Sequence, residues 1–175
     1  MFGGTETVAS VIEWAMTELM KCPGEMRKVQ EELAQVVGLN RKVHDQNDLD
    51  KLPYLKCAIK ETLRLHPPIP LLLHEAAEDC KIAGYFIPRG TWVSVNAWAI
   101  GRDKTAWEDP ETFRPDRFAK QGSADFKGNH FELIPFGSGR RSCPGMQLGP
   151  YTVELTMAQL LHCFNWALPN GMKPS

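Results

Sequence analysis

The sequence predicts a mainly α-helical protein with a small β-sheet. Four segments repeat apolar residues at spacings of three and four, which is the pattern of amphipathic helices. Two short stretches between residues 81 and 96 are instead rich in β-branched and aromatic residues and are bounded by turn residues. With 175 residues and 43% hydrophobic content, the chain can bury one ordinary core. We therefore expect a globular chain built mainly of helices.

The first three helices are expected before residue 67. An apolar stripe runs along residues 8–20 and reaches a break at Cys22-Pro23. Pro23 suits the first position of a second helix, which should end near Gly38. A polar loop then leads to a third helix, which starts near Pro53 and must stop before the proline-rich stretch that follows.

Beyond residue 67 the chain changes character. Residues 81–87 predict a short strand with a turn, and residues 91–96 predict a second strand of the same small sheet. Residues 99–135 have little periodicity, so we expect a long packed loop with one short helical turn. The last helix is expected just past Cys143. Pro150 lies inside it, where a proline costs up to about 3 kcal/mol.

Charge and cysteine content exclude several classes of function. The net charge is −1 and the basic residues are scattered, so neither a nucleic-acid surface nor an acidic tail is indicated. The five cysteines are irregularly spaced and form no CxxC pair, which argues against a disulfide framework and a four-thiolate zinc site. The sequence shows no signal peptide and no apolar run long enough for a bilayer. Both ends look cut, so we expect a partial domain.

The stretch FGSGRRSCPG, residues 136–145, sets Cys143 among arginines, glycines and a proline. A thiol acts as a metal ligand or nucleophile only as the thiolate, which a helix N-terminus and nearby arginines favour. Because Pro144 suits the first position of a helix, we expect Cys143 at about the N-cap of the last one. The glycines leave room for something flat to approach the backbone.

The residues alone leave other interpretations open. Cys143 could be a small buried hydrophobic residue, or a catalytic nucleophile, although no histidine of the chain carries a local signature of its base. Glu61 and Arg64 could form a solvated ion pair on one helix face. The stretch Thr5-Glu6-Thr7 could be a capping cluster that begins the first helix.

The order Phe136-x-x-Gly139-x-Arg141-x-Cys143-x-Gly145 matches the haem-binding signature of the cytochrome P450 family at every fixed position. The chain resembles that family in three further motifs. Residues 61–64 (ETLR) resemble its ExxR motif, residues 113–118 (FRPDRF) its PERF region, and residues 3–7 (GGTET) its oxygen-activation motif. The resemblance covers essentially all 175 residues. It implies the C-terminal part of the P450 fold, from the end of the I helix through the L helix, without the N-terminal anchor, the distal helices and the final strands.

The resemblance also implies roles for individual residues. The axial ligand of a haem iron would be Cys143. The other residues at the cofactor would be Phe136, Gly139, Gly145, Arg141 and His74, the last two as partners of the haem propionates. Protons for O–O cleavage would come from Glu6 and Thr7. The pocket that holds the substrate and dioxygen would be lined by Gly3, Gly4, Ile69, Leu71, Leu72 and Leu73. A buried network that locks the Cys143 loop would consist of Glu61, Arg64 and Arg117.

The implied function is that of a haem-thiolate monooxygenase, which uses O2 and electrons derived from NADPH. The chain most closely resembles plant ferulate and coniferaldehyde 5-hydroxylases, which hydroxylate a phenylpropanoid ring, in the combination of MFGGTETVAS, LRLHPPIPLLLHE, VNAWAIGRD and PFGSGRRSCPGMQLG. The implied partners are a small aromatic phenolic substrate and NADPH-cytochrome P450 reductase, with Arg140 and Lys127 as docking charges. The implied location is the cytosolic face of the endoplasmic reticulum membrane. A flavonoid hydroxylase and a truncated, non-catalytic gene product are the alternatives.

Overall fold

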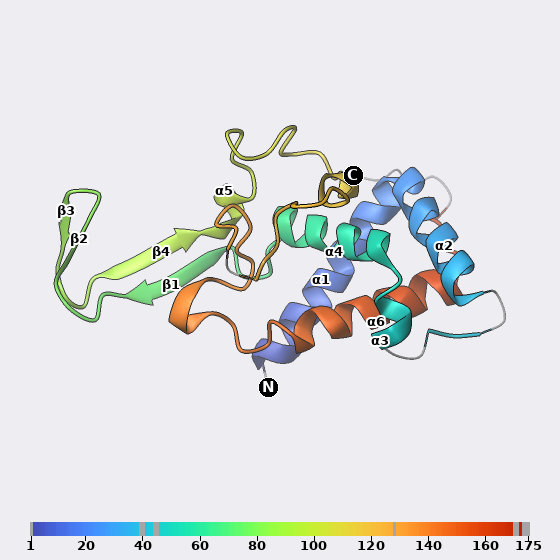
Figure 1. The fold of residues 1–175 in the computed structure, drawn as a ribbon, viewed down its shortest axis with the longest axis horizontal. Helices are drawn as coiled ribbons and strands as arrows, with labels where there is room; N and C mark the ends of the chain where they lie inside the picture. Colours follow the sequence, from blue (N-terminus) through green and yellow to red (C-terminus); the bar gives the residue numbers. More distant parts are fainter. Residues whose placement is uncertain (1, 39–40, 44–45, 128, 170–171, 173–175) are drawn as a thin grey trace.

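Helices form the body of the molecule, and a pair of small sheets forms an arm that extends from it (Figure 1). The structure is a computed structural model that describes residues 2–38, 41–43, 46–127, 129–169 and 172. The helices are α1 (Phe2–Lys21), α2 (Pro23–Val37), α3 (Gln46–Leu49), α4 (Pro53–Leu65), α5 (Ala97–Ile100) and α6 (Leu148–Cys163). The strands are β1 (Leu71–Glu75), β2 (Cys80–Ile82), β3 (Tyr85–Ile87) and β4 (Trp92–Asn96). The prediction of a mainly helical fold with little sheet is confirmed.

The hydrophobic core lies where α1, α2, α4 and α6 meet. Each of these helices buries the apolar stripe that its sequence spacing predicts. The fully buried side chains include Leu19 of α1, Leu33 of α2, Ile59 of α4 and Met157 of α6. Burial of such side chains stabilises the fold by roughly 1.5 to 3 kcal/mol each.

The start of α4 is fixed by a side chain from another helix. Pro53 occupies the first turn of α4, and the preceding Leu52 offers no capping side chain. Glu32 of α2 supplies the cap instead, because its carboxylate accepts hydrogen bonds from the backbone N–H groups of Tyr54 (2.7 Å) and Leu55 (3.0 Å). The helix that carries Glu61 is therefore held at its first turn by α2.

The interpretation of residues 5–7 as a capping cluster is wrong. Helix α1 begins at Phe2 and runs through all three residues. The hydroxyl of Thr7 donates to the carbonyl oxygen of Gly3, one turn earlier (2.8 Å). The motif therefore lies within a helix.

The expected sheet is wrong in its pairing. Residues 80–87 form a hairpin of their own, in which Cys80 of β2 pairs with Ile87 of β3. Its turn is made by Ala83 and Gly84, which both have positive φ (49° and 87°), as a tight two-residue hairpin requires. Strand β4 pairs instead with β1, from the apolar stretch after α4. The sequence of residues 67–74 allowed a buried strand as an alternative, but a continuous apolar run shows no alternation, so its pairing with β4 was not predicted, and the strand is in fact mostly exposed.

Helix α6 begins later than expected. It starts at Leu148, and Cys143 lies in the turn that precedes it rather than at its N-cap. Pro150 consequently falls in the first turn of α6, where the missing N–H has no intrahelical acceptor to lose. The expected loss of helix stability from a proline in the helix interior is therefore wrong.

The segment between β4 and α6 is mostly the long packed loop that was predicted for residues 99–135, but it holds more helical turns than the single one expected. It contains α5 and two 3₁₀ turns, η1 (Pro115–Phe118) and η2 (Gly139–Arg141). Trp107, Phe118 and Leu133 from this segment form a second small core with Cys57 of α4. No helix in the described part of the chain is long and apolar enough to cross a membrane.

Candidate functional site

A cavity of about 410 Å³ lies between α1, the stretch after α4, the Cys143 loop and the start of α6. From α1 it is lined by Gly3, Gly4 and Thr7, and from the Cys143 loop by Phe136, Arg141, Cys143 and Gly145. From residues 68–74 it is lined by Pro68, Ile69, Leu72, Leu73 and His74. Segments separated by more than 130 residues in sequence thus converge on one mostly apolar cavity.

The loop before α6 presents the thiol of Cys143. Its backbone N–H donates to the carbonyl oxygen of Phe136 (2.9 Å), which closes the loop on itself. Gly137 and Gly139 have φ of 70° and 78°, a left-handed conformation that glycine adopts without strain. Cys143 is exposed on the cavity side, so the interpretation of a buried small hydrophobic residue is wrong.

Space at the sulfur depends on Gly145. A Cβ added at this position would lie 3.6 Å from the Cys143 Sγ. A methyl group there would touch the sulfur at an ordinary van der Waals distance, so glycine leaves this side of the sulfur uncovered.

Three residues that were expected at the site lie elsewhere. Among the described residues, Glu6, Leu71 and Gly139 fall outside the cavity lining. Glu6 and Leu71 are both exposed. Gly139 instead supplies the positive φ at the start of η2.

Sequence reasoning missed part of the cavity wall. Val8 and Val11 of α1, Leu63 of α4, and Leu148 and Thr152 of α6 also line it. Val8 and Val11 lie one and two turns beyond Gly4, so a helical continuation of residues 3–7 would have found them. The contribution of α6 needed the three-dimensional arrangement of the helices.

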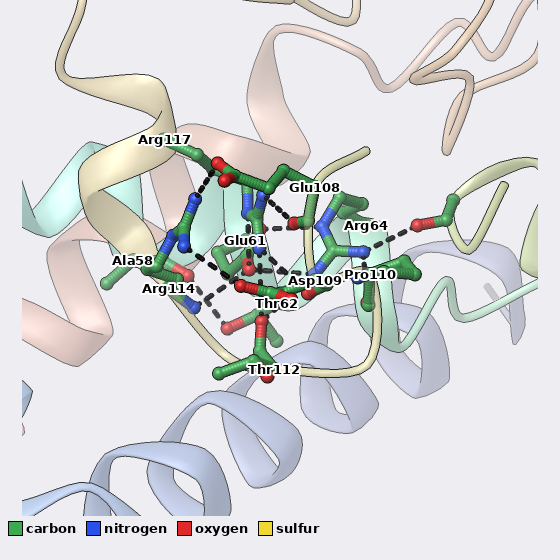
Figure 2. A network of polar contacts seen from close by, with 11 residues as sticks. Ala58, Glu61, Thr62, Arg64, Glu108, Asp109, Pro110, Thr112, Arg114 and Arg117 are labelled. Atoms are coloured by element: carbon green, nitrogen blue, oxygen red, sulfur yellow. Dashed lines mark hydrogen bonds and ion pairs between the residues drawn. The ribbon is translucent and has the colours of Figure 1, made fainter. Parts of the chain in front are cut away.

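A buried ionic network lies on the other side of α4 (Figure 2). Glu61 and Arg64 are only 0% and 1% exposed, so the solvated ion pair is excluded. Arg64 donates to both carboxylate oxygens of Glu61, through Nε (2.7 Å) and Nη2 (2.8 Å). Arg117 donates to the same carboxylate through Nε (2.9 Å), and so does the backbone N–H of Arg114 (2.8 Å). One carboxylate thus accepts four charge-assisted or backbone hydrogen bonds.

The remaining donors of the network hold the loop between residues 101 and 117. Arg64 donates to the backbone carbonyls of Gly101 (2.5 Å) and Pro110 (2.7 Å). Arg117 donates to those of Glu108 (2.9 Å) and Asp109 (3.2 Å). The segment that the network fixes directly is therefore this loop, rather than the Cys143 loop.

Gly101 is fixed by contact with α4. A Cβ at this position would lie only 2.3 Å from the carbonyl oxygen of Arg64. The absence of a side chain lets the loop come close enough for its own carbonyl to accept from Arg64.

Behind the cavity lies a smaller polar one of about 220 Å³. It shares Ile59 and Pro150 with the first cavity, and its other lining residues are Lys56, Lys60, Asp125, Phe126, Lys127 and Glu154. Burial raises the pKa of Glu154. Of the expected docking charges, Arg140 and Lys127 are both exposed.

The residues present fit a flat apolar group with acidic edges and a metal at its centre. The cavity is lined mainly by aliphatic side chains and glycines, it offers one exposed thiol, and it offers Arg141 and His74 as polar partners. A thiolate is a ligand that iron accepts, and an arginine suits a carboxylate. The donor set is thus that of a haem-thiolate site.

Comparison with known proteins identifies the family of this chain. The family model of cytochrome P450 matches residues 1–175. Cytochrome P450 84A1 of Arabidopsis thaliana is 66% identical over 175 residues, which are 100% of this chain and 34% of that protein. Geraniol 8-hydroxylase of Catharanthus roseus is 50% identical over 172 residues, 98% of this chain and 34% of that protein. A zebrafish cytochrome P450 solved with abiraterone superposes with a TM-score of 0.78 at 33% identity, over 91% of this chain and 36% of that one.

The chain belongs to the cytochrome P450 family. It spans about a third of the length of the curated relatives that it matches. Membership of this family implies a haem with a cysteine thiolate ligand, and O2 and NADPH-derived electrons as co-substrates.

Proposed function

We propose that this chain carries the thiolate side and part of the substrate pocket of a haem-dependent monooxygenase. The observation that supports this most strongly is the shared cavity, in which the Cys143 thiol faces the glycines and Thr7 of α1. When bound, haem supplies the activation of dioxygen. The Cys143 sulfur would hold the iron of the haem, and Arg141 and His74 would bind the carboxylates of the cofactor.

In the proposed mechanism, the residues of α1 handle protons. The Thr7 hydroxyl lines the cavity and donates to the Gly3 carbonyl, so a rotation of this side chain would turn its proton into the cavity. Glu6 is exposed on the same helix and would pass protons from solvent to Thr7. Gly3 and Gly4 leave open space, because a Cβ at either would meet nothing within 4 Å.

The proposed substrate is a phenylpropanoid ring that the enzyme hydroxylates. Ile69, Leu72 and Leu73 form an apolar wall that suits the face of an aromatic ring. A flavonoid is the alternative of the same chemical kind. Geraniol 8-hydroxylase, at 50% identity, raises a monoterpenoid alcohol as a second candidate, because the wall is aliphatic.

The proposed partner is NADPH-cytochrome P450 reductase, and Arg140 and Lys127 are the exposed charges proposed to contact it. The proposed location is the cytosolic face of the endoplasmic reticulum membrane. Loss of reductase-supported turnover in R140E, with an unchanged haem spectrum, would support this surface.

The first test is the absorption spectrum of the protein expressed from its complete reading frame, after reduction and exposure to carbon monoxide. A red-shifted band typical of a thiolate ligand should be present and should be lost in Cys143→Ser, while Cys163→Ser, at an exposed cysteine of α6, should keep it. A thiolate band that survives in Cys143→Ser would end the ligand assignment. No band in the parent protein would favour a non-catalytic gene product.

The substrate is tested by spectral titration of the same protein. Coniferaldehyde, a flavanone and geraniol should be compared as ligands that displace water from the haem. The proposal expects the phenylpropanoid to bind most tightly and to be hydroxylated on its ring. Preferential binding and oxidation of geraniol would replace it with the terpenoid candidate.

A further inference from the structure

Among the residues that the structure describes, no hydrogen bond joins the buried network of Glu61, Arg64 and Arg117 to the Cys143 loop. The donors of Arg64 and Arg117 reach residues 101–117, and the Cys143 loop closes through the Phe136 carbonyl. A connection between them must therefore run through packed side chains.

The first part of that connection is Trp107, which lies close to both arginines of the network. The Trp107 ring lies 5.3 Å from the Arg64 guanidinium carbon and 5.9 Å from that of Arg117. Trp107 in turn packs against Phe118 at 5.7 Å between ring centroids. These rings and Leu133 belong to the small second core. Because such cores are closely packed, a displacement of either arginine would shift the side chains of this core.

The second part of the connection is Phe126. It is packed against both hydrophobic clusters, the main core and the small core around Trp107. Its ring meets that of Phe136 at 5.1 Å between centroids and 60° between planes, a tilted aromatic pair. Phe136 is the residue whose carbonyl oxygen accepts from the Cys143 N–H.

The residue before Phe126 ties this point to α4. Asp125 Oδ2 lies 3.9 Å from Lys60 Nζ, next to Glu61 in sequence. The other oxygen, Oδ1, is buried and accepts no hydrogen bond from the described residues. The residue before Phe126 therefore lies beside the helix that carries the network, although a charge pair at this distance holds it only weakly.

We propose that Phe126 is a positioning residue that transmits the buried network of α4 to the Cys143 loop, and so holds the sulfur against its metal. The proposal rests on the function proposed above, because it takes Cys143 as the ligand. It assigns to Phe126 a role outside the haem-binding signature. Phe126 acts through Phe136 and does not itself line the main cavity.

The test replaces the ring at position 126 in the haem-loaded protein expressed from its complete reading frame. Phe126→Leu removes the aromatic pair, and Phe126→Met does so with an unbranched, more adaptable side chain if the leucine variant folds poorly. Phe126→Tyr keeps the ring. Phe131→Leu is the matched control, because Phe131 belongs to the same loop but is 68% exposed.

The readouts are the ratio of thiolate to thiol ligation in the reduced carbon monoxide spectrum and the reduction potential of the iron. Phe126→Leu or Phe126→Met should raise the thiol-ligated population by roughly fivefold, which corresponds to about 1 kcal/mol and matches the energy of an aromatic pair. Phe126→Tyr and Phe131→Leu should leave both readouts unchanged. A role in stability alone would lower the unfolding midpoint without moving the ligation ratio of the folded protein.

A double-mutant cycle tests the transmission itself. If Phe126 relays the network, the effects of Phe126→Leu and Arg117→Lys on the ligation ratio should be non-additive, whereas Phe131→Leu and Arg117→Lys should add. Equal ligation ratios in Phe126→Leu, Phe126→Met and Phe131→Leu would overturn the proposal. A parent protein whose thiolate band is absent or survives Cys143→Ser would instead refute the proposed function.

Discussion

The substitution Glu61→Gln should be among the most damaging single changes in this chain. Glu61 is fully buried, and its carboxylate accepts two hydrogen bonds from Arg64, one from Arg117 and one from the Arg114 backbone. A glutamine keeps the shape but removes the negative charge between two guanidinium groups. Its NH2 group would also face an arginine N–H, which is a donor where an acceptor is needed.

The size of the effect follows from burial. Removing one partner of a buried ion pair leaves the other charge without compensation and costs about 3 to 5 kcal/mol. Native domains are stable by only about 5 to 15 kcal/mol, so the variant should lose a large part of its stability. Glu111→Gln is the matched control, because Glu111 pairs with Arg102 at 3.1 Å but is 70% exposed. An exposed pair contributes at most about 1 kcal/mol.

The assay is urea unfolding followed by tryptophan fluorescence, in which Trp107 lies against both arginines. Glu61→Gln should strongly lower the urea concentration at the unfolding midpoint, and Glu111→Gln should barely change it. The dependence of the unfolding free energy on urea concentration should be unchanged in both variants. A loss below about 1 kcal/mol for Glu61→Gln would refute the reasoning, because it would mean that the charge of Glu61 is not what satisfies the arginines.

Three further predictions concern the scaffold around α4. Gly101→Ala should destabilise the fold by about 1 to 3 kcal/mol in urea unfolding, since its Cβ would meet the Arg64 carbonyl at 2.3 Å; alanine at the glycine of α2, which has open space, should cost nothing. Glu32→Ala should cost about 0.5 to 2 kcal/mol, because the first turn of α4 loses its cap, and an equal loss at an exposed glutamate of α2 would contradict this. A hydrogen bond from His66 holds the pKa of Glu18 below its ordinary value of 4.5, so this carboxylate stabilises the fold above that pH and the stabilisation is lost as the pH falls through the lowered pKa. Acid titration of Glu18→Gln should therefore show a shallower loss of stability than the parent, and an identical profile would exclude the pair as a cause.

Much of the fold could be predicted from the sequence, because local signals agree with the packing. Prolines at positions 23 and 53 begin α2 and α4, and the apolar stripes of the four long helices form the core. The partner of β4 could not be predicted, because the run PIPLLLH is apolar without alternation and gives no register. Pairing between distant segments depends on tertiary contacts that periodicity does not encode.

The candidate site could likewise be predicted only in part. The haem-binding signature gave the residues of the Cys143 loop, and the structure brings Arg141, His74 and Thr7 to the same cavity. The position of Cys143 relative to α6 could not be predicted, because Pro144 is compatible both with the first turn of a helix and with the turn that precedes one. The connection through Phe126 has no sequence signal, since a lone phenylalanine in a loop predicts no particular partner.

The substitution Pro150→Ala should change the stability of the protein in opposite directions, depending on whether Pro150 lies in the interior of α6, as the sequence suggested, or in its first turn, as in the structure. A proline in a helix interior would cost up to about 3 kcal/mol, so alanine would stabilise the protein by that amount. In the structure Pro150 lies in the first turn of α6, is buried, and separates the two cavities. Alanine there recovers no hydrogen bond, loses packing and increases the entropy of the unfolded chain, so we expect a destabilisation of about 1 kcal/mol in urea unfolding. A clear gain in stability would show that α6 begins earlier, with Cys143 at its cap.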